Sequence, residues 1–238
     1  MENSIYSKGY SYRSSVNVAT AFPALMRKVY VWMTLALVVT ALSAYYVATT
    51  PEMLYAILSN RMVFIGLLIE EVLMVVGMTA MINKISFMVA ALMMAAYSVL
   101  NGATMSVIFV IYDLASIATT FFVTAGTFAS MAIVGYTTKK DLTKMGGILM
   151  MAVIGLVIAN VVNWFLQSEM MAYIVSGIGV LVFTGLTAYD SQKIKNMLLQ
   201  CDSVNDGTQK LALLGSLTLY LDFVNLFLYL LRFMGKRK

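Results

Sequence analysis

The chain has 238 residues, of which 61% are hydrophobic and only 11% are charged, and its formal net charge is +5. Soluble domains carry about 25% charged residues, so this composition excludes an ordinary soluble fold and predicts a membrane protein. The sequence contains no histidine, which excludes histidine-based zinc sites, serine–histidine–aspartate triads and the usual neutral-pH switch. The modest positive charge gives no reason to expect a nucleic-acid partner.

The first 28 residues are polar and basic, and they lack the pattern of a signal peptide. We expect residues 1–28 to be a cytosolic segment and residues 29–238 to form one all-α domain. Seven apolar runs in that domain have about the 20 residues needed to cross the hydrocarbon core. They are Val29–Thr49, Met62–Ile82, Ser86–Ile111, Ala115–Tyr136, Gly146–Leu166, Met171–Tyr189 and Leu211–Leu231. The connections between them are short, apart from Asp190–Lys210.

The basic residues of the connections predict the orientation, because cytosolic loops carry an excess of lysine and arginine. If the N-terminus is cytosolic, the basic residues inside are Lys8, Arg13, Arg27, Lys28, Lys84, Lys139, Lys140, Lys144, Lys193, Lys195 and Lys210. Those outside are Arg61, Arg232, Lys236, Arg237 and Lys238. The C-terminal tail is the one inconsistency. Either it is tolerated outside, or the last segment enters the membrane and returns.

The formal charges within the seven runs are Glu70, Glu71 and Asp222, and Asp190 lies at the cytosolic end of the sixth run. Ionisable residues in a membrane usually face the bundle interior, which makes them functional candidates. Glu70 and Glu71 point about 100° apart, so one of them is expected to face inward. A structural role stays open for Asp222 as a hydrogen-bonded acid, and for Asp190 as a helix end paired with Lys193.

The last run carries a stripe of small and polar residues at helical spacing. Its members are Gly215, Thr218, Asp222, Asn225 and Tyr229, and the opposite face is aliphatic, with Leu213, Leu217, Leu221, Val224, Leu228 and Leu231. We therefore expect this helix to be buried along its polar stripe, central in the bundle. A weaker stripe on the sixth run ends at Asp190, which predicts that Asp190 and Asp222 meet near the cytosolic mouth. Asn101, Asn160 and Asn163 are interpreted as interhelical hydrogen-bonding residues.

Two carboxylates a few ångströms apart cannot both ionise cheaply, so the pair shares a proton. Such a pair would titrate near neutral pH without any histidine. When both acids are ionised they repel, and they offer oxygen ligands to a hard cation such as Ca²⁺, which takes about six to eight oxygens. The acids are too few for a tight cage. We expect transient, hydrated Ca²⁺ binding at Asp190 and Asp222 inside a pore, and no cofactor.

Four stretches resemble one known family: "RKVYVWMTLALVVTAL", "YSVLNGATMSVIFVIY", "TAYDSQKIKNM" and "LYLDFVNLFLYLLRF". From about Met26 to Phe233 the chain is similar to the Bax inhibitor-1 (transmembrane Bax-inhibitor-motif) family, especially its prokaryotic members. The resemblance implies a seven-helix bundle with the last helix central, and a pH-sensitive calcium leak sensed by Asp190 and Asp222. It aligns Glu71, in "GLLIEEV", with the second-helix glutamate of the family. Glu71 and Asn225 are therefore candidates for contact with the permeating cation.

The chain departs from the family at one point. In some relatives a basic residue at the cytosolic end of the second helix contacts the aspartates. Here the stretch is "TAMINKIS", with Ile82 nearest the expected place and Lys84 two residues later. Either Lys84 replaces this basic latch, or the latch is absent and closure depends on the acids alone.

The expected function is a passive, proton-gated Ca²⁺ leak through the lipid bilayer, and two alternatives stay open. Two aspartates on consecutive late helices are typical of intramembrane aspartyl proteases, although those enzymes carry a Gly-x-Gly-Asp motif and Asp222 follows Tyr220 and Leu221. The chain is also compatible with a membrane interaction protein that modulates a membrane protease or a cell-death component through the loop Cys201–Lys210. The similarity to prokaryotic members favours a bacterial inner membrane over the endoplasmic reticulum.

Overall fold

The computed structural model describes the backbone of residues 2–238 and the side chains of residues 20–238. Lys8 and Arg13 of the charge count, and most of the predicted cytosolic segment 1–28, lie outside the described side chains. The helices are α1 (Glu2–Thr49), α2 (Pro51–Ser59), α3 (Arg61–Met81), α4 (Phe87–Met105), α5 (Ile108–Ile111), α6 (Leu114–Thr137), α7 (Thr143–Leu166), α8 (Glu169–Leu198) and α9 (Asp206–Met234). Along the described backbone the β-structure is one isolated bridge, between Tyr112 and Arg237.

Seven of these segments are long and apolar enough to cross a membrane, which confirms the predicted all-α, multi-pass architecture. They are Thr20–Thr49 of α1, then α3, Phe87–Ile111 (α4 and α5), α6, α7, α8 and α9. Their order along the chain matches the order of the predicted runs. The short helix α2 connects the first span to the second and was not predicted.

The sixth and seventh spans are longer than predicted. α8 continues to Leu198 rather than ending at Tyr189, and α9 begins at Asp206 rather than Leu211. The predicted loop Asp190–Lys210 is therefore mostly helical, and Asp190 lies inside α8. The extension of α8 contains buried polar residues such as Ser191 and Gln192. An apolar window misses such a segment because it packs on protein rather than on lipid.

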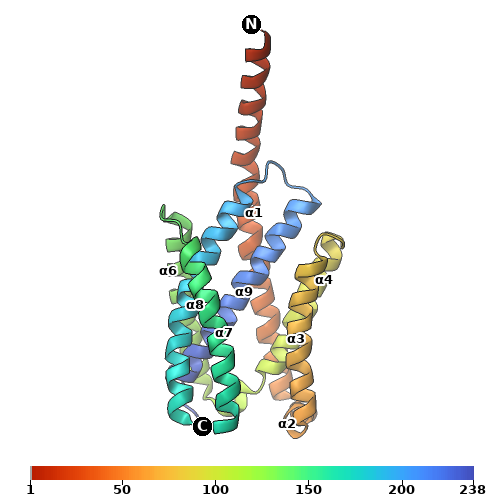
Figure 1. Ribbon diagram of the computed structural model, residues 1–238. Helices are drawn as coiled ribbons and strands as arrows, with labels where there is room; N and C mark the ends of the chain where they lie inside the picture. The colour runs from red at the N-terminus through yellow and green to blue at the C-terminus, as the bar shows by residue number, and fades with distance from the viewer. Residues whose placement is uncertain (1) are drawn as a thin grey trace.

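Helix α9 is the most buried of the seven spans. Within its apolar window 67% of the residues are buried, against 6% for α3 and 11% for α7. α9 contacts α1, α4, α6 and α8, whereas α3 packs on α2 and α4, and α7 packs on α8. Its central position in the membrane-embedded bundle stays a prediction, and its contacts with four helices support that position (Figure 1).

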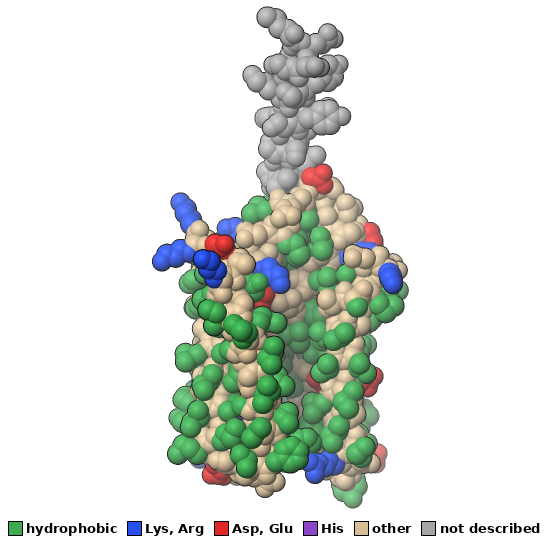
Figure 2. All heavy atoms as spheres, viewed as in Figure 1, with side chains coloured by type: hydrophobic (Ala, Val, Ile, Leu, Met, Phe, Trp, Pro, Cys, Tyr) green, Lys and Arg blue, Asp and Glu red, His purple; other side chains and the backbone are tan. Residues whose placement is uncertain are grey.

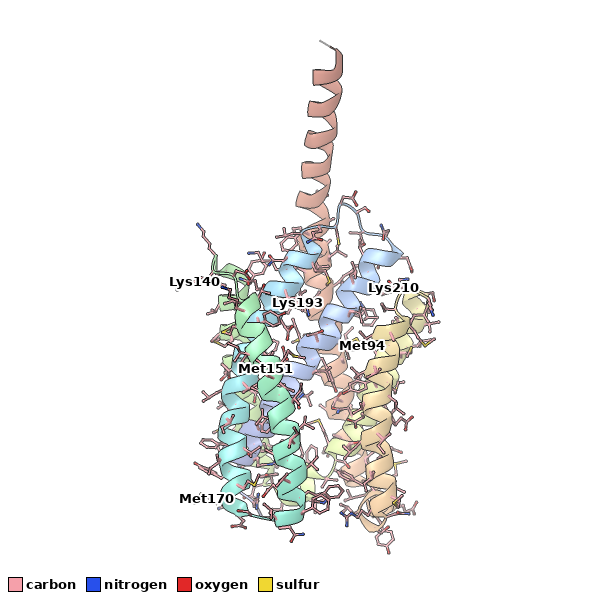
Figure 3. The ribbon with its side chains drawn as sticks, viewed as in Figure 1. Met94, Lys140, Met151, Met170, Lys193 and Lys210 are labelled. Carbon is pink, nitrogen blue, oxygen red and sulfur yellow. The ribbon has the colours of Figure 1, made fainter. Side chains whose placement is uncertain are left out.

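The two ends of the bundle can be identified from labelled side chains. Lys140, Lys193 and Lys210 lie at one end, and Met170 lies at the other (Figure 3). α9 is one continuous helix of 29 residues, which at about 1.5 Å per residue is about 44 Å long, more than the roughly 30 Å of hydrocarbon. The last segment therefore does not turn back, and the C-terminus lies at the end opposite the lysines (Figure 1).

The C-terminal tail is fixed by backbone hydrogen bonds to the connection between α5 and α6. Asp113 N–H donates to the carbonyl oxygen of Lys236 at 3.2 Å, and Lys238 N–H donates to that of Ile111 at 3.0 Å. The amide of Lys236 also donates to Ser116 Oγ at 3.0 Å. These bonds hold the backbone of the basic tail against the protein.

This arrangement predicts that the loop after α8 and the C-terminal tail face opposite sides of the membrane. In a Cys201→Ser background, we expect Lys238→Cys in right-side-out vesicles to react with a membrane-impermeant maleimide. Ser203→Cys, at an exposed loop position, should react only after permeabilisation, and both should react in permeabilised vesicles. Labelling of Ser203→Cys from outside would contradict the orientation.

A second prediction concerns the contact between α6 and α8. A Cβ atom at Gly135 would lie 2.0 Å from the carbonyl oxygen of Ala188, whereas one at Gly126 of the same helix would have nothing within 4 Å. We expect Gly135→Ala to lower the free energy of unfolding by about 2 kcal/mol or more, because overpacking against backbone cannot relax. Gly126→Ala should change it by less than about 1 kcal/mol. Thermal unfolding in detergent measures both, and equal effects would argue against the close contact.

Candidate functional site

Asp190 of α8 and Asp222 of α9 lie close enough for their carboxyl groups to interact directly. Both side chains are buried, at 7% and 5% exposure respectively. The structure thus brings together the two acids that the sequence singled out. The role of the pair in sensing pH stays a prediction.

The packing of α8 on α9 explains why these two acids face each other. On the cytosolic side of the pair, a Cβ at Gly215 would lie 3.1 Å from Ile194. On the other side, a Cβ at Gly179 would lie 2.5 Å from the ring of Tyr229. A glycine of one helix thus accepts a large side chain of the other at both ends of the interface. These two contacts set the antiparallel register that places Asp190 opposite Asp222.

No cation neutralises the aspartate pair by direct contact within the described side chains. The single ion pair among the described side chains joins Lys210 to Asp206 at 3.3 Å. Lys193 acts on Asp190 electrostatically, but its ammonium group is exposed and lies 5.8 Å from the centre of the Tyr189 ring. Oδ2 of Asp222 is buried without a hydrogen-bond partner. Two buried like charges cannot both persist cheaply, so these surroundings agree with the expected sharing of one proton, which stays a prediction.

Lys84 does not occupy the position of a latch in this conformation. Its side chain is exposed, and the described side chains include no hydrogen bond or ion pair between Lys84 and either aspartate. The connection after α3 is instead fixed to the first turn of α9. Lys210 Nζ donates to the carbonyl oxygen of Ile85 at 3.0 Å, and the amide of Phe87 donates to Asp206 Oδ1 at 3.2 Å. Lys210 is the residue that sequence reasoning missed here, because only the fold brings it to the loop.

Glu71 forms a second, separate acidic site. It is half-buried, whereas Glu70 is exposed. Asn101 Nδ2 of α4 donates to Glu71 Oε2 at 3.0 Å, and Oε1 is buried without a hydrogen-bond partner. Tyr220 of α9 donates its hydroxyl to Asn101 Oδ1 at 2.9 Å. Sequence analysis assigned Tyr220 no role, since a tyrosine in an apolar helix gives no signal of its partner.

The other amide side chains take different roles. Asn160 is interhelical as predicted: its Nδ2 donates to Tyr229 Oη at 3.1 Å, and its Oδ1 accepts from Arg232 at 2.9 Å. Asn163 does not join two helices within the bundle as predicted. Its Oδ1 accepts from the backbone amide of Ser168 in the turn between α7 and α8. Asn225 donates to the carbonyl oxygen of Leu221 in its own helix at 2.8 Å. This bond leaves the Oδ1 atom of Asn225 unused, and the predicted contact of Asn225 with a cation stays a prediction.

The burial of α9 differs from the predicted two-faced pattern. The predicted aliphatic face is largely buried, with Leu213, Leu217, Val224 and Leu231 all inside. The half-buried stripe instead consists of Leu211, Leu214, Thr218, Leu221, Asn225 and Leu228. The reason is that α9 packs on four helices, so its aliphatic residues fill the core and Thr218 and Asn225 face the one side that remains.

That remaining side is a hollow on the surface of the bundle. Figure 2 shows it between the side formed by α7 and the side formed by α3 and α4. The stripe of α9 is half-buried rather than buried, so this side of the helix is the less covered one. At the end of the bundle that holds the C-terminus, the guanidinium of Arg61 lies 4.5 Å from the centre of the Trp164 ring. This cation–π contact joins α3 to α7 and closes the hollow there.

Comparisons with known proteins agree with this architecture. A family model described as "Inhibitor of apoptosis-promoting Bax1" matches residues 23–238. The chain is 47% identical to the inner membrane protein YbhL of Escherichia coli over 226 residues, which cover 94% of this chain and 97% of that protein. It is 42% identical to an uncharacterized protein of Borreliella burgdorferi over 213 residues, covering 90% and 92% of the two chains. The protein RP147 of Rickettsia prowazekii is 38% identical over 213 residues, covering 90% and 89%. None of these three names specifies an enzymatic activity.

The contacts of Lys210 predict that it stabilises the cytosolic end. We expect Lys210→Ala to lower the free energy of unfolding by about 1–2 kcal/mol, because the carbonyl oxygen of Ile85 loses a charged donor. The exposed Lys84 is the matched control, and Lys84→Ala should change that free energy by less than about 0.5 kcal/mol. Thermal unfolding of the purified variants tests the difference. A larger loss for Lys84→Ala would restore the latch interpretation.

Proposed function

The chain belongs to the Bax inhibitor family, and we propose that it is a pH-sensitive calcium leak channel of the bacterial inner membrane, gated by the Asp190–Asp222 pair. The observation that carries this proposal is the contact of two buried carboxyl groups, one on each of two packed helices. The inner-membrane location rests on the similarity to YbhL. H⁺ is the gating ion and Ca²⁺ the permeating one.

The gating argument is electrostatic. One shared proton gives a hydrogen bond that joins α8 to α9 across the pair. Loss of that proton leaves two charges which, at about 4 Å and an effective dielectric constant of about 20, repel each other by about 4 kcal/mol. The conformations of a two-state protein typically differ by a few kcal/mol. The protonation state of the pair is therefore sufficient to select between two packings of α9.

The permeation argument concerns oxygen ligands. The described residues contain no cluster of three or more histidine, cysteine, aspartate or glutamate side chains that could hold a metal ion. Glu71 and Asn225 offer oxygen ligands from two different helices, α3 and α9, and a hydrated Ca²⁺ ion would meet them one at a time. Ca²⁺ prefers about six to eight oxygens. Weak, sequential contacts suit a leak, since a tight cage would retain the ion.

The proposal predicts the behaviour of the aspartate variants. In proteoliposomes with a trapped Ca²⁺ indicator, we expect wild-type Ca²⁺ flux to change between acid and neutral pH. Asp190→Asn or Asp222→Asn should bring the ratio of the two fluxes to about one, because an amide cannot exchange the shared proton. Glu70→Gln, which removes an exposed acid from α3, is the control and should keep the wild-type ratio. If both aspartate variants keep a wild-type pH profile, the assignment is wrong.

A further inference from the structure

Four side chains from four helices form a continuous hydrogen-bonded chain that the proposed gating pair does not use. Glu71 of α3 accepts from Asn101 of α4 at 3.0 Å, and Asn101 accepts from Tyr220 of α9 at 2.9 Å. The hydroxyl groups of Tyr220 and Thr40 of α1 lie 2.7 Å apart. Thr40 Oγ1 is also 3.1 Å from the carbonyl oxygen of Ser98. Tyr220 is fully buried and Thr40 is 4% exposed, so bulk water does not compete for these bonds.

The number of hydrogens in this chain restricts which bonds exist together. Each hydroxyl group has one hydrogen to donate. If Asn101 donates to an ionised Glu71, its Oδ1 accepts from Tyr220, and Tyr220 in turn accepts from Thr40. The single hydrogen of Thr40 is then used, and the carbonyl oxygen of Ser98 receives none from it. In this arrangement the chain joins α1 to α9.

Protonation of Glu71 on Oε2 reverses every donor in the chain. The side-chain amide of Asn101 then rotates by about 180°, so that its Oδ1 accepts from Glu71. The rotated amide fills nearly the same space because its oxygen and nitrogen atoms are similar in size. Asn101 Nδ2 donates to Tyr220, and Tyr220 donates to Thr40. The hydrogen of Thr40 is now free to reach the carbonyl oxygen of Ser98. In this arrangement Thr40 still bonds to Tyr220 of α9, now as the acceptor, and its own hydrogen also joins α1 to α4.

We propose that Asn101, Tyr220 and Thr40 are positioning residues of a reversible relay, which transmits the protonation state of Glu71 to α9 by reversing the hydrogen bond between Tyr220 and Thr40 and so freeing the hydrogen of Thr40 to bond to α4. The proposal deepens the proposed function and rests on it where ion flux is concerned. Tyr220 precedes Asp222 by two residues on the same helix. The relay therefore acts on the helix that carries half of the aspartate pair.

The surroundings of Glu71 suit a carboxyl group that exchanges a proton. Oε1 is buried and unpartnered, so the carboxylate form lacks half of its possible hydrogen bonds. The titratable groups that act on Glu71 electrostatically are Tyr97 of α4 and Tyr220 of α9, and both are neutral at ordinary pH. Thr104 of α4 adds a hydroxyl. No lysine or arginine forms an ion pair with Glu71 among the described side chains.

The first test measures the relay in the full-length protein without any flux. The C–O stretching band of Tyr220, isolated by subtracting the infrared spectrum of Tyr220→Phe, distinguishes a donating phenol from an accepting one. We expect this band to change between acid and neutral pH in the wild type, and to be unchanged by pH in Glu71→Gln. A band insensitive to pH in the wild type, or still sensitive in Glu71→Gln, would overturn the relay.

The second test uses Ca²⁺ flux in proteoliposomes. Thr40→Val is nearly isosteric, leaves the carboxyl group of Glu71 untouched and removes the end of the relay. We expect Thr40→Val and Tyr220→Phe each to move the pH of half-maximal flux by about half to one unit, the effect of one hydrogen bond. Neither should move it further in a Glu71→Gln background, because the relay then has no proton to sense.

The matched control is Tyr229→Phe, which removes a hydrogen-bonded phenol from α9 outside the relay. Its shift should add to that of Glu71→Gln, as independent sites do. Additive shifts for Thr40→Val and Glu71→Gln would contradict the relay. If the wild type shows no pH-dependent flux, the proposed function fails, and the infrared result alone then decides the relay.

Discussion

The close packing of α8 against α9 is the constraint on which the rest of the structure depends. Gly179 and Gly215 leave room for the side chains of Tyr229 and Ile194. In this register Asp190 and Asp222 are both buried. Removing an ion from water costs several kcal/mol even after relaxation. Two buried acids at this interface would therefore be more stable sharing a proton than both ionised. That this interface also makes the site sensitive to pH stays a prediction.

α9 joins two groups of helices that otherwise have little contact. On one side α1, α3 and α4 pack together, and on the other side α6, α7 and α8 do so (Figure 1). Tyr220 and Asp222 are two positions apart and point about 200° apart around the helix. Tyr220 accordingly contacts the first group and Asp222 the second. A change at either acidic site thus acts on the same helix from opposite sides.

The sequence predicted the architecture well because hydrophobic length depends on local composition alone. It also placed Asp190 and Asp222 together, since each lies on a stripe of small residues that only a close helix contact accommodates. It failed where burial in protein replaced burial in lipid: the end of α8 carries Gln192, which bonds to the α6–α7 connection through Leu142 and Lys140. The contacts of Tyr220 with Asn101 and Thr40, more than a hundred residues away, carry no local signal at all.

The close approach of α6 to α8 has a consequence for the backbone beside Asp190. Gly135 of α6 lies against the main chain of Ala188. Ala188 is two residues before Asp190 on α8. Backbone-to-backbone contact leaves no soft side chain to absorb a displacement. The close contact of α6 with α8 therefore restricts displacement of the backbone next to Asp190.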